Sequence, residues 1–295
     1  MTTHSHTLYK SSQVTYAIWQ LMRMDKPYGV MLLYWPCAWT ILLTQQNTSF
    51  PGISLFIFFI GALIMRACGC VINDIADRDI DGHVERTKNR PIAAGILSIT
   101  TAIVVFCILS ISALSLWIFL QEQTRLLSII GFVLACMYPF AKRYIACPQV
   151  VLGVAFAWGV PMACTEQQGA IDIRCALLYV AVVVWIIGYD TVYALQDRED
   201  DKKLNIGSSA LFFGSKVRDV VAVLYTGFLF LMAIVGRLYK CSSMYYIAWV
   251  IVGGILCMQV ISIQIASKQA YKQAFLSNQW IGLLITLAIL LDRFM

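Results

Sequence analysis

Charged residues are scarce in this sequence. Asp, Glu, Lys and Arg make up 13% of its 295 residues and apolar residues make up 60%, whereas a soluble domain is about 25% charged and about 45–50% apolar. Apolar runs recur along the chain, and a helix needs roughly 20 such residues to cross a bilayer. The alternation in segments of about 10 residues that is typical of a membrane β-barrel is absent. We therefore exclude a soluble globular protein and expect an all-α protein that spans the lipid bilayer several times.

Motifs typical of a His or Cys metal site are also missing. The three histidines do not form such a motif, none of the ten cysteines forms a CxxC motif, and the CxC pair of Cys68 and Cys70 has no nearby histidine, so no His or Cys metal site is expected. Several cysteines lie in apolar runs, where cysteine behaves as a small hydrophobic residue; these are Cys37, Cys68, Cys70, Cys107, Cys136 and Cys257. We therefore predict that the cysteines pack without forming disulfides.

A removable signal peptide is not evident either. The N-terminal 27 residues contain neither an apolar core nor a cleavage site of small residues, so the first apolar span is expected to direct insertion. We predict a cytoplasmic or interfacial N-terminal segment at residues 1–27 and a single transmembrane domain at residues 28–295.

The apolar runs predict nine transmembrane spans, at about 28–46, 53–72, 97–119, 126–140, 148–165, 176–190, 219–236, 244–266 and 279–293. With the N-terminus in the cytoplasm, most of the 22 Lys and Arg residues fall on the cytoplasmic side, as the positive-inside rule requires. That rule also accounts for the net charge of +6. Nucleic acid is therefore not an expected partner, and no obligate protein partner is evident.

Most of the 16 acidic residues gather in two short segments, "NDIADRDIDGHVERTKNRP" at 73–91 and "YDTVYALQDREDDKK" at 189–203. Each follows an even-numbered span on the cytoplasmic side. Asn73 and Asp197 are 124 positions apart, as are Asp77 and Asp201. This spacing predicts an internal repeat of two four-helix halves plus one extra helix, with the site at the cytoplasmic mouth of the repeat interface.

The acidic residues recur at helical spacing. On a helix that continues the second span, four side chains would share one face: Asn73, Asp77, Asp81 and Glu85. On the end of the sixth span, Asp190, Asp197 and Asp201 would do the same, with Tyr193 nearby. We therefore expect two acidic faces that oppose each other across a cavity.

Opposed carboxylates repel one another, so a cation is expected between them. An oxygen-rich ligand set suits Mg²⁺, which is usually held by one or two carboxylates together with substrate phosphates. Nearby basic residues would neutralise the remaining phosphate charge; these are Arg78, Lys142, Arg143, Lys202 and Lys203. In a membrane protein, this pattern favours a lipid diphosphate as substrate. When the diphosphate group of an allylic lipid departs, the lipid is left as a carbocation, which aromatic faces stabilise.

The two segments also resemble a known family. "NDIADRDID" matches the N-D-x-x-D-x-x-x-D motif of the UbiA superfamily of membrane-embedded aromatic prenyltransferases, and "DTVYALQDREDD" is similar to its second motif. "DGHVERTKNRP", "YPFAKRY" and "GSSALFFG" resemble the 4-hydroxybenzoate polyprenyltransferase branch of bacterial ubiquinone synthesis. The resemblance implies Mg²⁺-dependent transfer of a polyprenyl chain from polyprenyl diphosphate to the carbon ortho to the hydroxyl of 4-hydroxybenzoate, in the bacterial inner membrane.

The resemblance further implies roles for single residues. Mg²⁺ and diphosphate would be bound by Asn73, Asp77, Asp81, Asp197 and Asp201, with a lesser role for Asp74. Lys142 and Arg143 match a basic pair that binds diphosphate or the acceptor's carboxylate, and Arg78 and Lys202 would also contact substrate. Asp190 and Tyr193 would position the phenol. Arg66, a charge inside an apolar run, is expected to bind substrate or an acid.

Several alternatives remain at this point. Haem-farnesylating and menaquinone-forming enzymes share the acidic motifs and differ in the acceptor. A secondary transporter would place its acids in mid-span, a CDP-alcohol phosphotransferase has a motif that "DGHVERT" does not fit, and a soluble prenyl synthase lacks membrane spans. Arg86, Lys88 and Arg90 serve either the site or the membrane topology, and Arg23 and Lys26 are expected to be interfacial anchors.

Overall fold

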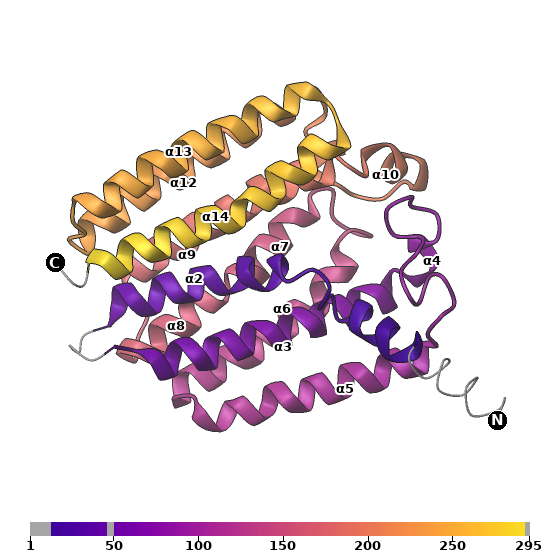
Figure 1. Ribbon diagram of the computed structural model, residues 1–295, viewed down its shortest axis with the longest axis horizontal. Helices are drawn as coiled ribbons and strands as arrows, with labels where there is room; N and C mark the ends of the chain where they lie inside the picture. The colour runs from indigo at the N-terminus through magenta and orange to yellow at the C-terminus, as the bar shows by residue number, and fades with distance from the viewer. Residues whose placement is uncertain (1–12, 46–49, 293–295) are drawn as a thin grey trace, which may run out of the picture.

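The computed structural model describes residues 13–45 and 50–292, and all regular structure in these ranges is helical (Figure 1). Residues 13–21 form a helical segment. The elements that follow are α2 (Tyr28–Thr44), α3 (Gly52–Ala76), α4 (Arg78–Asp81), α5 (Ile99–Leu116), η1 (Trp117–Phe119), α6 (Glu122–Ala141), α7 (Pro148–Ala157), α8 (Gly159–Gln168), α9 (Ile173–Ala194), α10 (Arg198–Leu204), α11 (Ser209–Phe212), η2 (Gly214–Lys216), α12 (Val217–Leu238), α13 (Ser243–Ser262), η3 (Ile263–Ile265) and α14 (Lys268–Asp292).

The prediction of an all-α, multi-pass membrane protein is confirmed. Within the described ranges, eight helices are long and apolar enough to cross a membrane. The predicted first span corresponds to α2, which has only 17 residues, so the count of nine spans is not confirmed. The predicted fifth span is divided between α7 and α8, which meet at Trp158.

The helices occupy positions that match their sequence patterns. The sequence of α9 is apolar on all sides, and such a helix is expected in the interior; it packs against α7, α12 and α14, and its Trp185 stacks on Phe228 at 5.6 Å. In α5, by contrast, only Ala102 and Val105 are buried. The remaining apolar surface of α5 therefore faces outward, at the edge of the bundle (Figure 1).

The last helix, α14, lies between α13 and α2 and also contacts α9. Polar contacts fix it there, because Trp185 Nε1 donates to Asn278 Oδ1 at 2.9 Å and Trp39 Nε1 donates to the Gly282 carbonyl at 3.1 Å. A side chain at Gly282 would overlap the Trp35 ring. Close approach of α14 to α2 therefore requires glycine at this position.

The two acidic segments have a similar local structure, which corrects one prediction. Each segment begins on its long helix but then leaves it, since α3 ends at Ala76 and α9 ends at Ala194. Asp77 (φ −95°, ψ 4°) and Asp197 (φ −104°, ψ 3°) then precede the short helices α4 and α10. The ends of α3 and α9 lie 118 positions apart and the starts of α4 and α10 lie 120 positions apart, so no single structural offset replaces the 124-position spacing of the motifs.

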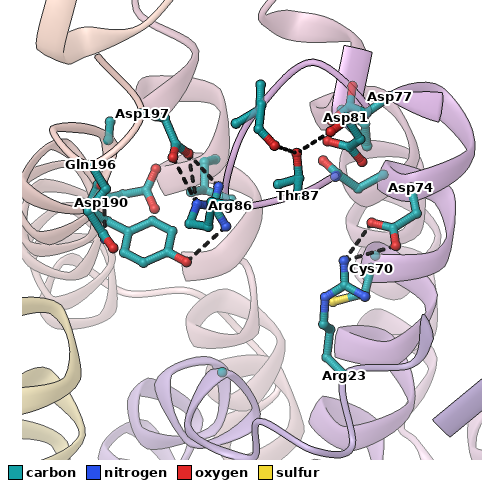
Figure 2. A pocket seen from close by; sticks show the side chains of 18 of the residues that line it. Arg23, Cys70, Asp74, Asp77, Asp81, Arg86, Thr87, Asp190, Gln196 and Asp197 are labelled. Atoms are coloured by element: carbon teal, nitrogen blue, oxygen red, sulfur yellow. Dashed lines mark hydrogen bonds and ion pairs between the residues drawn. The ribbon is translucent and has the colours of Figure 1, made fainter. Parts of the chain in front are cut away.

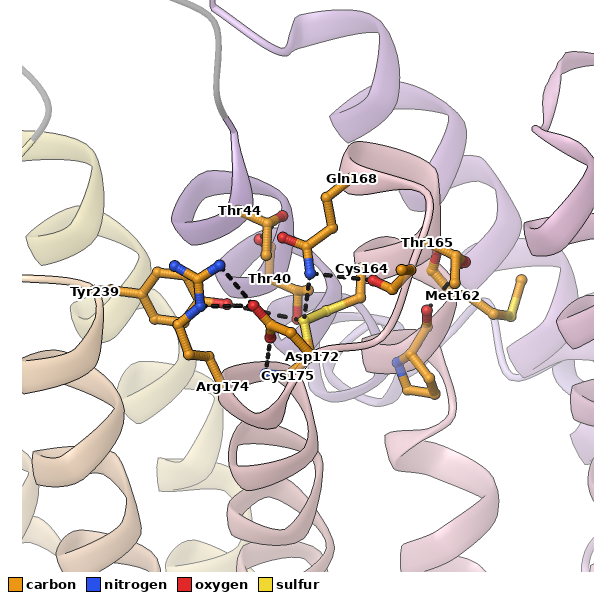
Figure 3. The surroundings of a disulfide bond; sticks show 12 residues. Thr40, Thr44, Met162, Cys164, Thr165, Gln168, Asp172, Arg174, Cys175 and Tyr239 are labelled. Atoms are coloured by element: carbon orange, nitrogen blue, oxygen red, sulfur yellow. Dashed lines mark hydrogen bonds and ion pairs between the residues drawn. A yellow bond between two sulfur atoms is a disulfide. The ribbon is translucent and has the colours of Figure 1, made fainter.

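A disulfide corrects the prediction that the cysteines stay unpaired. Cys164 in α8 and Cys175 in α9 are joined, with their Cα atoms 6.4 Å apart (Figure 3), a separation that suits a disulfide. The turn between them forms because Gly169 adopts φ 74° and because Asp172 accepts a hydrogen bond from the Cys175 amide at 2.9 Å. The disulfide lies at the start of α9, whereas the second acidic segment begins on the last turns of α9 and continues beyond its end.

Candidate active site

One cavity of about 630 Å³ collects residues from both acidic segments. Figure 2 shows Asp77 and Asp81 on one side of it and Asp190 and Asp197 on the other, with Arg86 between them. The residues predicted from the sequence that line it are Arg66, Asn73, Asp77, Asp81, Lys142, Asp190, Tyr193, Asp197 and Asp201. The structure thus brings acidic residues from both segments together at one place, whereas Glu85, predicted to share the face of Asp77 and Asp81, is exposed and does not line the cavity.

Three side chains predicted to bind substrate do not line this cavity. Arg78 is exposed and lies 3.5 Å from Asp79, which is 75% exposed. Arg143 is exposed and donates a hydrogen bond to the Ala76 carbonyl. Lys202 is also exposed, on α10. All three face outward at the rim.

Buried ion pairs hold the first segment. Asp77 Oδ2 lies 2.5 Å from Lys142 Nζ, and Asp81 Oδ2 lies 2.7 Å from Arg90 Nη1. Burial raises the pKa of Asp77 above its ordinary value, although the Lys142 ammonium opposes this. The other oxygen, Asp77 Oδ1, is buried and has no hydrogen-bond partner among the described residues. Asp77 therefore offers an unused acceptor to a ligand in the cavity.

Asp74 connects the N-terminal segment to the site, which gives it a larger structural role than predicted. It is 1% exposed and lies 2.7 Å from Arg23 and 3.1 Å from Arg90. Arg23 is therefore a partly buried partner of this acid, and its placement as an interfacial anchor stays a prediction. The helical segment 13–21 is fixed in addition by Leu21, which belongs to the same buried apolar cluster as Val71 of α3.

Arg86, in the loop that follows α4, connects this loop to the second acidic segment. Its guanidinium donates to both carboxylate oxygens of Asp197, at 2.5–3.0 Å, and to the Tyr193 hydroxyl at 3.1 Å. It also lies 5.0 Å from the centre of the Tyr193 ring. Arg86 and Arg90 therefore belong to the cavity. The sequence left their role open, and its only signal was the resemblance of "VERTKNRP" to the family.

Basic side chains lie among the carboxylates of both segments in the cavity. Seven acidic and seven basic side chains line the cavity: Asp25, Asp74, Asp77, Asp81, Asp190, Asp197 and Asp201 with Arg23, Lys26, Arg66, Arg86, Arg90, Lys142 and Lys272. No ion pair involving Asp190 or Asp201 is found in the described part of the chain. Burial, together with the Asp197 carboxylate, raises the pKa of Asp201 to about 6.

The inner end of the cavity, around the Arg66 guanidinium, is lined by apolar and aromatic side chains that include Leu32, Leu152 and Phe156. The Arg66 guanidinium lies 5.7 Å from the centre of the Phe156 ring, and its buried Nε has no partner among the described residues. It lies so close to Gly29 of α2 that a Cβ there would be 2.6 Å from Nε. Glycine at this position thus makes room for the charge.

Known proteins are similar to this chain in sequence and in fold. The model of the UbiA prenyltransferase family matches residues 33–284. The chain is 42% identical over 274 residues to a 4-hydroxybenzoate octaprenyltransferase of Tolumonas auensis, covering 92% of this chain and 95% of that protein. It is 40% identical over 284 residues to the enzyme of the same name from Saccharophagus degradans, covering 96% and 94%.

Solved structures with the same fold come from archaea. A UbiA homologue from Aeropyrum pernix aligns with a TM-score of 0.76 at 22% identity, covering 89% of this chain and 97% of that one. A homologue from Archaeoglobus fulgidus bound to GPP and Mg²⁺ aligns with a TM-score of 0.68 at 15% identity, covering 95% and 100%. On the extent of the family match and of the two bacterial relatives, this chain belongs to the UbiA prenyltransferase family.

Proposed function

We propose that the protein transfers a polyprenyl chain from polyprenyl diphosphate to the ring carbon ortho to the hydroxyl of 4-hydroxybenzoate. The C–O bond to diphosphate breaks, a C–C bond to the ring forms, and the ring carbon loses its proton. The observation that carries this proposal is a single cavity whose mouth joins both acidic segments and whose inner end is apolar and aromatic. The bacterial relatives named for this reaction support the choice of acceptor.

The residues at the mouth of the cavity fit a divalent metal ion, and we propose Mg²⁺. The buried Asp77 Oδ1 has no hydrogen-bond partner among the described residues and is an oxygen donor of the kind that Mg²⁺ prefers. Mg²⁺ is usually held by one or two carboxylates together with substrate phosphates. The donors would be Asn73, Asp77, Asp81, Asp197 and Asp201. A bound ion would supply Lewis-acid stabilisation of the departing diphosphate.

Basic side chains at the mouth would bind the diphosphate. Lys142, Arg86 and Arg90 already face carboxylates there, and phosphate oxygens offer the same charge and hydrogen-bonding geometry. We propose that diphosphate replaces carboxylates as a partner of these groups. Contacts from Arg78, Arg143 and Lys202, on the outer rim, remain predictions.

The inner end of the cavity would bind the acceptor. We assign its carboxylate to Arg66, because the Nε of Arg66 is unpartnered and buried, whereas Lys142 is paired with Asp77 and Arg143 lies outside the cavity lining. Asp190 and Tyr193 line the same cavity. They would position the phenol, with Asp190 accepting a hydrogen bond from its hydroxyl.

We further propose that the protein lies in the bacterial inner membrane with the cavity and the N-terminus on the cytoplasmic side. The distribution of Lys and Arg supports this orientation. The disulfide supports it independently, because it lies at the other end of α9 and disulfides persist in oxidising compartments such as the periplasm.

The first experiment supplies purified membranes with radiolabelled 4-hydroxybenzoate and a polyprenyl diphosphate, with Mg²⁺ or with EDTA. We expect label in the lipid extract only when Mg²⁺ is present. Transfer to a haem or dihydroxynaphthoate acceptor instead would contradict the proposed acceptor and retain the chemistry. No transfer to any acceptor from well-folded protein would overturn the enzymatic proposal and favour a transporter.

A further inference from the structure

The segment that follows the second acidic helix, residues 205–209, is fastened to the loop that follows α6. Asn205 adopts a left-handed conformation (φ 53°) that turns the chain at the end of α10. The Gly207 amide then donates a hydrogen bond of 3.1 Å to the carbonyl of Lys142. This contact joins the two halves of the repeat, because Lys142 follows the fourth predicted span and Gly207 follows the sixth.

The same segment is held on its other side by buried polar groups. The Ser209 amide donates to Gln149 Oε1 at 2.9 Å, and the Ser209 hydroxyl donates to Thr191 Oγ1 at 2.9 Å. Ser209 and Thr191 are fully buried, so each bond is shielded from water. The segment thus has fixed contacts to α7, to α9 and to the loop after α6.

Glycine at position 207 is required by close packing. A Cβ there would overlap the carbonyl oxygen of Ile145 and lie 3.1 Å from that of Lys142. Both obstacles are backbone atoms, which cannot move aside as a flexible side chain does. The glycine after the first acidic helix, Gly82, has no atom within 4 Å of the corresponding position, so the requirement is specific to the second half.

We propose that the hydrogen bond from the Gly207 amide to the Lys142 carbonyl, which we call the Gly207 clasp, positions the diphosphate-binding groups of the two halves relative to each other. Lys142 connects the two halves. Its side chain forms an ion pair with Asp77 in the first acidic segment, and its carbonyl accepts a hydrogen bond from Gly207, which follows the second acidic segment. The Ile206 amide in turn donates to the Asp201 carbonyl at 3.0 Å. Gly207 is therefore a positioning residue that acts through Lys142 and Asp201, an inference that rests on the proposed function.

The test compares Gly207→Ala with the matched control Gly82→Ala. For Gly207→Ala we expect the KM for polyprenyl diphosphate and the Mg²⁺ concentration at half-maximal rate to rise at least tenfold. The KM for 4-hydroxybenzoate should stay within twofold of the wild-type value, because Arg66 lies apart from the clasp. Hydrogen–deuterium exchange of residues 203–212 should be faster in Gly207→Ala and unchanged in Gly82→Ala.

A second variant, Ser209→Ala, keeps the backbone and removes one buried bond, so it tests the clasp if Gly207→Ala does not insert. We expect about a threefold rise in the same KM, with faster exchange. Equal kinetics and equal exchange in Gly207→Ala and Gly82→Ala would overturn the clasp, as would equal losses of affinity for both substrates. If even the wild type transfers nothing, the proposed function fails, whereas the exchange measurement still tests the clasp.

Discussion

The two ends of α9 are secured in different ways. At its C-terminal end, the cavity is held by exchangeable contacts: Arg86 binds Asp197, and Lys142 binds Asp77. At its N-terminal end, a covalent bond joins Cys175 to Cys164, and the Asp172 cap fixes the turn. A substrate can take over the partners of an ion pair but cannot displace a disulfide. The chain thus has a covalent link at one end of α9, while the ion pairs at the other end are of a kind that a charged ligand can replace.

Substitutions of carboxylates that line the cavity should lower the rate of transfer more than any other change. We expect Asp77→Ala and Asp201→Ala each to lower the rate of transfer at least about 100-fold, equivalent to about 2.7 kcal/mol of transition-state stabilisation, because each removes a proposed donor to the metal–diphosphate complex. The measurement is kcat/KM for polyprenyl diphosphate in membranes that contain matched amounts of inserted protein.

Asp79→Ala is the matched control for these substitutions. Asp79 belongs to the same acidic segment but is 75% exposed and does not line the cavity, so we expect activity within twofold of wild type. Near-normal activity in Asp77→Ala or Asp201→Ala would remove the proposal that both segments bind the metal.

Substitution of Arg66 should have a smaller effect on transfer, and one that concerns the acceptor more than the polyprenyl diphosphate. Replacing it with Met removes the proposed partner of the acceptor's carboxylate, and a hydrogen bond to a charged group contributes about 1.5–3 kcal/mol. We expect the KM for 4-hydroxybenzoate to rise about 30-fold, while the KM for polyprenyl diphosphate stays within twofold. Steady-state kinetics with each substrate varied in turn would measure both values.

Two comparisons sharpen the Arg66 experiment. Arg66→Lys keeps the positive charge and should recover part of the affinity. With 4-hydroxybenzaldehyde, which lacks the carboxylate, wild type and Arg66→Met should differ little. If the variant loses the same factor with both acceptors, Arg66 shapes the cavity and does not bind the carboxylate.

The sequence predicted the fold class and the meeting of the two acidic segments, because apolar run length and motif order report on both. It did not predict where the helices end. Asp77 and Asp197 stand at helical spacing from their neighbours, and neither Gly nor Pro marks the break. Only the structure shows that each residue precedes a short helix of its own.

The partners of the carboxylates were harder to predict, because they depend on how a loop folds back. Arg86 is 111 residues from Asp197, and no periodic pattern relates the two. The disulfide was missed for a similar reason. Ten cysteines allow many pairings, and Cys164 and Cys175 meet only because a glycine turn and an Asp cap reverse the chain between them.

The disulfide end should give the smallest effect on activity and a measurable effect on stability. Linking residues 11 positions apart contributes up to about 3 kcal/mol in the chain-entropy account. For Cys164→Ser and Cys175→Ser we therefore expect Tm to fall by about 5 °C. Transfer at 25 °C should stay within twofold, since Cys175 and the nearest acidic residue of the cavity on α9, Asp190, are about 22 Å apart along the helix at 1.5 Å per residue.

Cys107→Ser is the control, because Cys107 is a free, exposed cysteine on α5; its Tm should match wild type. The oxidation state can be read directly after thiol blocking and trypsin digestion without reduction, since cleavage after Arg174 leaves peptides 144–174 and 175–198 joined only through a disulfide. Cys147 lies in the first peptide, so the digestion is repeated with Cys147→Ser. Unlinked peptides from cells would show that this end of the protein is reduced. That result would remove both the expected Tm difference and the disulfide's support for a cavity on the cytoplasmic side.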